Sequence, residues 1–202
     1  MKALFWRSAR FLYGLPDSEI GFCDLVVPLG YGLTIDDELP DATKKTVLEA
    51  IRVAEKHKAR IVWASSNYFF PGCERVENEK KLALFGPEFS MSPILIGSGI
   101  TNSVSEAREI KIACQKASLF PKDIVVVCDW PHARSTRLIW RKVFPESNIL
   151  IRNVEGHWDE THRATLQKSQ ERWLLACLLR HVALITLGHE RVSRIQHPTD
   201  HS

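Results

Sequence analysis

The sequence contains no pair of cysteines in a Cys-x-x-Cys spacing. Its five cysteines are odd in number and widely spaced, at Cys23, Cys73, Cys114, Cys128 and Cys177. This pattern argues against both a disulfide framework and a zinc site. A reducing compartment fits such cysteines best, so we expect a cytoplasmic protein.

Long uninterrupted apolar runs are also absent. Near the N-terminus, Arg7, Arg10 and Asp17 interrupt the apolar stretch before a secretory segment could form. The most apolar late stretch, residues 173–187, is too short to cross a bilayer comfortably and carries Arg180 near its middle. We therefore expect no signal peptide and no membrane span, and we interpret the late stretch as a core-packed helix.

Charge of one sign does not dominate the chain. The 27 basic and 24 acidic residues give a formal net charge of +3, and they are spread along the sequence. Because no long basic face is present, we expect no nucleic-acid partner, whereas small anionic ligands fit the composition.

The length of 202 residues and the 45% hydrophobic content predict one globular domain. We expect its core within about residues 22–188, between a short N-terminal helix and a polar C-terminal tail.

Several catalytic motifs are missing. The sequence has no Walker loop, no G-x-S-x-G and no H-E-x-x-H, so ATPase, α/β-hydrolase and zincin activities lose their main support. His157 and His162 resemble a metal cluster, but a spacing of five residues places them on different faces of a helix. We therefore expect no metal site.

Apolar strand-like runs alternate with helical patterns throughout the chain. The expected strands cover residues 24–30, 60–65, 93–97, 123–128 and 148–152, and the expected helices cover 43–58, 74–85, a segment opening at 103, a segment after 129, and about 162–187. Asp41 and Asp129 are the expected N-caps of two of these helices. This alternation predicts an α/β fold: a doubly wound, mostly parallel five-stranded sheet with helices on both faces, in a Rossmann-like three-layer sandwich.

In such a fold, ligands bind outside the carboxyl ends of the strands. Gly30 and Gly32 follow the first strand, where glycine lets the backbone approach a ligand closely or turn tightly. Ser65 and Asn67 follow the second strand. We take these four residues as candidate ligand-binding positions, although a tight turn alone also explains the two glycines.

Asn102, Ser103 and Glu106 follow the third strand. Ser103 and Glu106 have the S-x-x-E spacing of a capping box, which explains both residues through helix stability alone. Capping by Ser103 leaves Asn102 unexplained. The alternative is a polar platform in which all three residues contact a ligand.

The densest polar cluster follows the fourth strand. Asp129 and His132 could both face one ligand and exchange protons with it, which makes them the candidate catalytic pair. Arg134 and Arg137 could present positive charge to a phosphate or carboxylate. The structural alternative is that Asp129 caps the helix, His132 lies in its first turn and the arginines form a solvated face.

Taken together, these segments resemble the YdcF/SanA/ElyC-like family, a group of bacterial α/β proteins with a domain of unknown function. The resemblance covers most of residues 24–155 and is carried by DLVVPLGYG (24–32), SSN (65–67), NSVSEA (102–107) and VCDWPHARS (127–135). The family patterns are D-x-x-V-V-L-G-G-G, S-G-G, N-T-x-x-E-A and V-T-S-x-x-H-x-x-R-A. This chain departs from them at Tyr31, Asn67, Ser103 and Ser135.

The resemblance implies a Rossmann-like fold and a pocket for a nucleotide-like ligand, with S-adenosylmethionine or another adenosine compound as the candidate. It also implies an association with bacterial envelope biogenesis. Our leading hypothesis is a protein, enzymatic or not, that binds such a molecule. One alternative is a non-catalytic protein of envelope or polysaccharide metabolism, for which Tyr31 and Trp130 would fill the cleft. Another is a small hydrolase or phosphoryl-group enzyme that uses Asp129 and His132.

Overall fold

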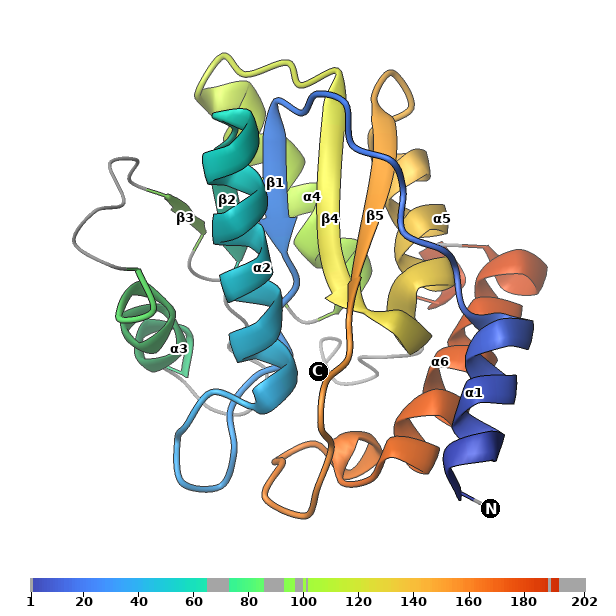
Figure 1. The fold of residues 1–202 in the computed structure, drawn as a ribbon. Helices are drawn as coiled ribbons and strands as arrows, with labels where there is room; N and C mark the ends of the chain where they lie inside the picture. Colours follow the sequence, from blue (N-terminus) through green and yellow to red (C-terminus); the bar gives the residue numbers. More distant parts are fainter. Residues whose placement is uncertain are drawn as a thin grey trace, which may run out of the picture.

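Five parallel strands form the centre of the computed structural model, which describes residues 2–64, 73–85, 93–96, 100, 102–188 and 190–192 (Figure 1). The strands are β1 (Leu25–Pro28), β2 (Arg60–Ala64), β3 (Ile94–Ile96), β4 (Asp123–Asp129) and β5 (Asn148–Val154). They pair in the order β3-β2-β1-β4-β5, and every pairing is parallel. The predicted five-stranded α/β fold is confirmed.

The helices cover both faces of the sheet. They are α1 (Lys2–Tyr13), α2 (Asp41–His57), α3 (Cys73–Leu82), α4 (Ser103–Lys116), α5 (Ala133–Val143) and α6 (Gln170–Leu187), with 3₁₀ turns η1 (Trp130–His132) and η2 (Thr165–Gln167). In Figure 1, α2 lies in front of the sheet, α4 and α5 lie behind it, and α1 and α6 lie side by side at one edge.

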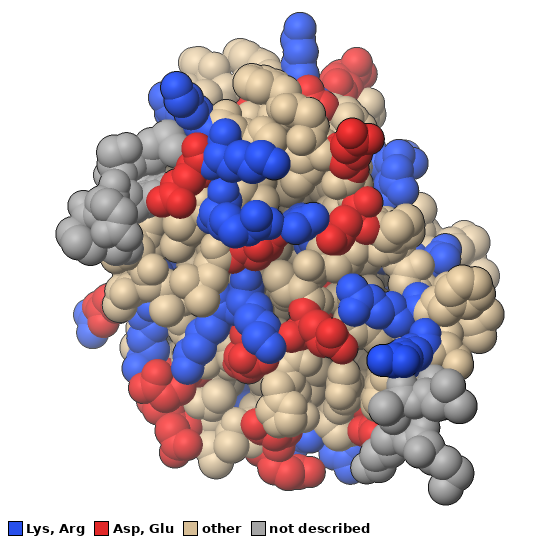
Figure 2. All heavy atoms as spheres, viewed as in Figure 1, with Lys and Arg blue, Asp and Glu red and all other residues tan. Residues whose placement is uncertain are grey.

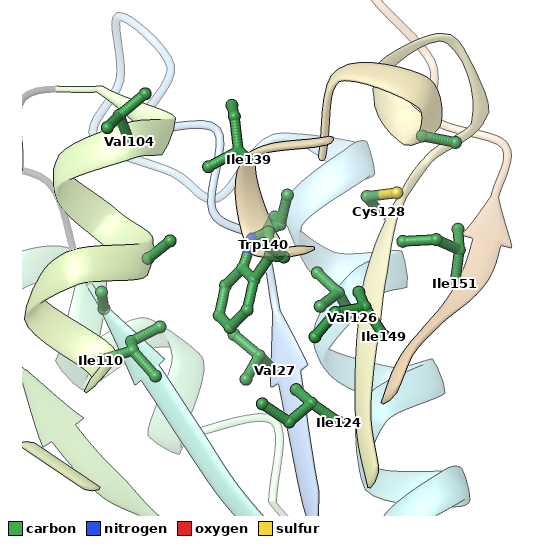
Figure 3. Close-up of a cluster of buried hydrophobic side chains, with 14 of the residues drawn as sticks. Val27, Val104, Ile110, Ile124, Val126, Cys128, Ile139, Trp140, Ile149 and Ile151 are labelled. Atoms are coloured by element: carbon green, nitrogen blue, oxygen red, sulfur yellow. The ribbon is translucent and has the colours of Figure 1, made fainter. Parts of the chain in front are cut away.

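Alternating side chains of the strands produce two separate apolar layers. Val26, Val125 and Val127 pack with Ala50 and Val53 of α2 on one face. The alternate residues of the same strands point to the other face of the sheet. They lie in the layer under α4 and α5, where Trp140 and Ile110 pack against the sheet (Figure 3). A strand that is buried on both faces has no polar side to mark its period, which explains the continuous Ile and Val run of β4.

Two helix starts differ from the prediction. Helix α2 begins at Asp41 itself, with Pro40 in the N-cap position, and the Asp41 carboxylate accepts the backbone N–H of His157 instead of capping. Helix α6 begins at Gln170, not near His162. His162 is held in an antiparallel bridge with Thr34, and the Ser169 hydroxyl caps α6 by accepting the N–H of Arg172.

The charged surface is mixed. On the face shown in Figure 2, Lys and Arg side chains lie among Asp and Glu side chains. Within the described part of the chain, none of the helices is long and apolar enough to cross a membrane.

Candidate ligand site

A cavity of about 610 Å³ lies at the carboxyl ends of β1, β2 and β4. Residues that follow these strands, or that open α4, form one side of it: Gly30, Tyr31, Gly32, Ala64, Asn102, Ser103, Glu106 and His132. The other side comes from Arg163–Gln167, and from Trp173 and Arg180 on α6. A volume of this size suits a small-molecule ligand.

Six predicted ligand-contact residues therefore meet in one cavity, namely Gly30, Gly32, Asn102, Ser103, Glu106 and His132. Ser65 and Asn67 lie outside the described residues. Asp129, Arg134 and Arg137 are not among the residues that line the cavity. Tyr31 and Trp130 do not fill the cleft, which was one alternative from the sequence. Tyr31 forms part of the wall, and Trp130 is buried against Trp6.

The two glycines serve different purposes. A Cβ atom at Gly30 would lie 2.6 Å from Oε1 of Glu77 and 2.8 Å from Nζ of Lys81, so only glycine lets the backbone pass these side chains. Gly32 has a φ of +77°, a left-handed conformation that favours glycine. Gly30 is therefore required by the close approach of side chains, and Gly32 is favoured by the geometry of the turn.

Helix α4 is capped one residue earlier than predicted. The Asn102 side chain accepts the backbone N–H groups of Val104 and Ser105, each at 2.9 Å, and the Ser105 hydroxyl accepts the Asn102 N–H. Asparagine is at least as good an N-cap as serine. The expected Ser103–Glu106 box is therefore wrong. Because Asn102 caps the helix, Ser103 and Glu106 point their side chains elsewhere.

The Ser103 hydroxyl faces the imidazole of His132. Its Oγ lies 3.3 Å from Nε2 of His132, and Nη1 of Arg180 lies 2.9 Å from the same nitrogen. Burial, with a smaller contribution from Arg180, holds the pKa of His132 well below its usual range. The imidazole is therefore neutral at physiological pH.

Arg180 is the cation of this cavity that lacks a carboxylate partner. Its guanidinium contacts His132 and lies over the ring of Trp173, at 5.7 Å from the ring centroid. No ion pair joins it to any residue in the described ranges. Arg163, by contrast, bonds Asp37 and the Thr34 carbonyl. Among the described residues, no carboxylate therefore neutralises the charge of Arg180 in the cavity wall.

Three buried ionisable side chains, Glu77, Lys81 and Glu106, form what we call the charge cluster. Nζ of Lys81 lies 2.7 Å from Oε1 of Glu77 and donates to the Ala64 carbonyl. Burial raises the pKa of Glu106 to about 8; Lys81 opposes the rise and Glu77 adds to it. Glu106 therefore carries a proton at neutral pH, and the cluster as a whole is close to neutral.

Asp129 does not cap the following turn, and that prediction is wrong. Its Oδ1 accepts the Gly156 N–H at 2.9 Å, and its Oδ2 accepts the indole N–H groups of Trp158 and Trp173 at 3.0 and 2.9 Å. Desolvation raises its pKa to about 6 despite these donors. Both carboxylate oxygens are thus engaged, Oδ1 with Gly156 and Oδ2 with the two tryptophans, and these contacts make Asp129 a positioning residue.

The two predicted arginines of α5 also have other contacts. Arg134 donates from Nε to the carbonyl of Tyr13 and lies over the Tyr13 ring, so it holds α1. Burial lowers the pKa of Arg137, and the nearby charge of Arg141 lowers it further. Neither Arg134 nor Arg137 lines the cavity. The cation that replaces them in the cavity, Arg180, comes from α6.

Residues of the cavity wall that sequence reasoning missed come from outside the strand ends. Trp173 and Arg180 are about two helical turns apart, a spacing that places both on one face of α6. Glu77, which lines the cavity, and Lys81, which pairs with it, have the i,i+4 spacing of a helical ion pair. Both spacings are visible in the sequence, but neither spacing indicates that the residues concerned lie near the strand ends.

His157 and His162 do not assemble a metal centre. Among the residues that the structure describes, no group of three or more His, Cys, Asp or Glu side chains could hold a metal ion.

Comparison of the chain with protein-family models, with curated proteins and with solved structures found no match. The resemblance to YdcF-like proteins therefore stays a prediction.

Proposed function

We propose that this protein binds a nucleotide-like small molecule with an anionic group in the cavity at the strand ends. The observation that carries the proposal is Arg180, a guanidinium in the cavity wall with no carboxylate partner among the described residues. A charge in a partly buried position is stabilised by an opposite charge. An anionic ligand supplies that opposite charge.

The rest of the cavity supports a ligand that also has neutral polar groups. The protonated Glu106 and the Ser103 hydroxyl offer hydrogen bonds, while Tyr31, Ile100 and Leu166 add apolar contact area. A few polar groups in a largely apolar wall are typical of small-molecule sites. S-adenosylmethionine is the first candidate, because the sequence resemblance implies it and its carboxylate can pair with Arg180.

The proposed compartment is the cytoplasm. Four cysteines, Cys23, Cys114, Cys128 and Cys177, are free and buried. Unpaired thiols fit a reducing environment, in which adenosine compounds are also present.

The test has two parts. Native mass spectrometry of protein extracted without denaturation identifies a small molecule that copurifies with it. Melting temperatures are then measured with S-adenosylmethionine, S-adenosylhomocysteine, ATP and adenosine at millimolar concentration. A ligand that binds only the folded state raises the melting temperature by mass action. No shift with any of the four compounds would reject this ligand class.

A further inference from the structure

The Ser103 hydroxyl takes no part in capping α4, although Ser103 is the first residue of that helix. Asn102 and Ser105 close the capping box between them. The hydroxyl of Ser103 instead lies 3.3 Å from Nε2 of His132, in the wall of the cavity. A serine and an imidazole at this distance have the arrangement of a nucleophile and its general base.

The nitrogen that faces Ser103 is the basic one. A guanidinium can only donate hydrogen bonds, so the contact with Arg180 at 2.9 Å requires a lone pair on Nε2 of His132. The ring proton is then on Nδ1. Because His132 is 3% exposed, burial keeps the imidazole neutral, so Nε2 retains its lone pair.

Packing orients this imidazole in place of a carboxylate. In many serine hydrolases, an aspartate holds the second ring nitrogen of the base. Here Nδ1 of His132 has no hydrogen-bond partner among the described residues, and Asp129 bonds the two tryptophans instead. The rings of Tyr31 and Trp173 pack against His132 at centroid distances of 6.1 and 5.5 Å.

We propose that Ser103 is a nucleophile activated by His132, and that the pair cleaves carboxylic esters that also carry an anionic group. This inference rests on the proposed function, because the anionic group must bind Arg180 in the same cavity. When that group pairs with Arg180, the guanidinium leaves Nε2 of His132. The freed lone pair then accepts the proton of Ser103, so substrate binding itself activates the serine.

The reaction follows in two steps. Oγ of Ser103 forms a bond to the ester carbonyl carbon, the carbon–oxygen bond to the alcohol breaks, and the proton held on Nε2 passes to the leaving alcohol. Water then attacks the acyl-serine, gives its proton to Nε2 and releases the acid, while Oγ of Ser103 recovers the proton. No oxidant, metal or second substrate other than water is needed.

The test is covalent labelling of the full chain with diisopropyl fluorophosphate, followed by intact-mass and peptide mass spectrometry. The reagent forms a phosphorus–oxygen bond to serine, fluoride leaves, and the hydroxyl proton passes to His132. We expect one adduct, on Ser103. Ser103→Ala should remove it. The exposed Ser8 provides a matched control, since Ser8→Ala should leave labelling unchanged.

Arg180→Gln gives a second readout that does not depend on the stability of the His132 variant. The reagent is uncharged and does not displace the guanidinium, so removing Arg180 frees Nε2 and should speed labelling several-fold. In this Arg180→Gln background, His132→Gln should then slow labelling about 100-fold or more, the usual effect of removing a general base. Absence of an adduct on Ser103 in both wild type and Arg180→Gln would overturn the proposal, and so would equal rates in Arg180→Gln and in a folded double variant that also carries His132→Gln. A shift in melting temperature with an adenosine compound but no adduct would leave the proposed function standing and remove only this inference.

Discussion

Nε1 of Trp173 donates a hydrogen bond to Oδ2 of Asp129 across 2.9 Å and thereby joins α6 to the end of β4. Trp158 donates to the same oxygen, and the rings of the two tryptophans lie 4.8 Å apart. One buried carboxylate therefore positions both tryptophans, of which Trp173 lines the cavity. It also fixes α6, the helix that carries Arg180 in the cavity wall.

Asp129→Asn should destabilise the protein even though the change is nearly isosteric. Asparagine keeps one acceptor oxygen and replaces the other with an NH₂ group, so at least one of the three N–H donors loses its partner. A buried donor without a partner costs about 1–3 kcal/mol. Urea denaturation measures this loss. The matched variant Trp158→Phe removes one donor, and the two changes combined should cost less than the sum of the single changes. Full additivity would show that the contact is not a stabilising one.

Asn102→Ala should cost about 1 kcal/mol of unfolding free energy, because it removes the side-chain cap of α4. Ser103→Ala should cost less than about 0.5 kcal/mol, since the Ser103 hydroxyl caps nothing. Chemical denaturation of both variants tests the position of the cap. A larger loss for Ser103→Ala than for Asn102→Ala would support the S-x-x-E box predicted from the sequence instead.

Gly30→Ala should destabilise the chain by about 1–3 kcal/mol, the usual cost of overpacking a buried position. The new methyl group would meet the Glu77 carboxylate and the Lys81 ammonium, both fully buried. Gly21→Ala is the matched control, because nothing lies within 4 Å of a Cβ atom at that position. Similar melting temperatures for Gly30→Ala and wild type would show that the charge cluster moves aside easily.

Glu106→Gln should change how stability depends on pH. Glu106 has a pKa raised from 4.5 to about 8 in the folded chain. Between these values the folded chain keeps the proton and the unfolded chain has lost it, so the free energy of unfolding falls as pH rises. Glutamine stays neutral and removes this fall. The melting temperature of the variant should therefore rise relative to that of wild type as the pH is raised from about 5 to about 8. Glu109→Gln, on the same helix and outside the cavity, should follow the wild-type curve.

The fold was predictable because its signals are local and repeated. The Ile and Val run of β4 and the helical spacing in α2 each need only one segment to be recognised. Strict alternation of strands and helices then leaves few arrangements other than a parallel sheet. The edge at which the polar residues gather follows from that sheet, which is why six of the candidate residues do line one cavity.

The parts that were not predictable depend on contacts between distant segments. Asp129 looked like a helix cap, but its partners Gly156 and Trp173 lie 27 and 44 positions further along the chain. Arg134 was a reasonable anion contact from its spacing, yet α1 covers it through the Tyr13 carbonyl. At Asn102 two caps of similar strength compete, and propensity alone does not separate them.

The central claim, that Arg180 binds the anionic group of a ligand in the cavity, is tested most directly by calorimetric titration. S-adenosylmethionine, or the adenosine compound with the largest melting shift, is titrated into wild type, Arg180→Gln and Arg134→Gln. Arg134 provides the matched control because its guanidinium binds Tyr13 outside the cavity. Loss of a charge-assisted hydrogen bond should weaken binding about tenfold or more in Arg180→Gln, whereas Arg134→Gln should stay within about twofold of wild type. Equal affinity in Arg180→Gln and wild type would contradict the account.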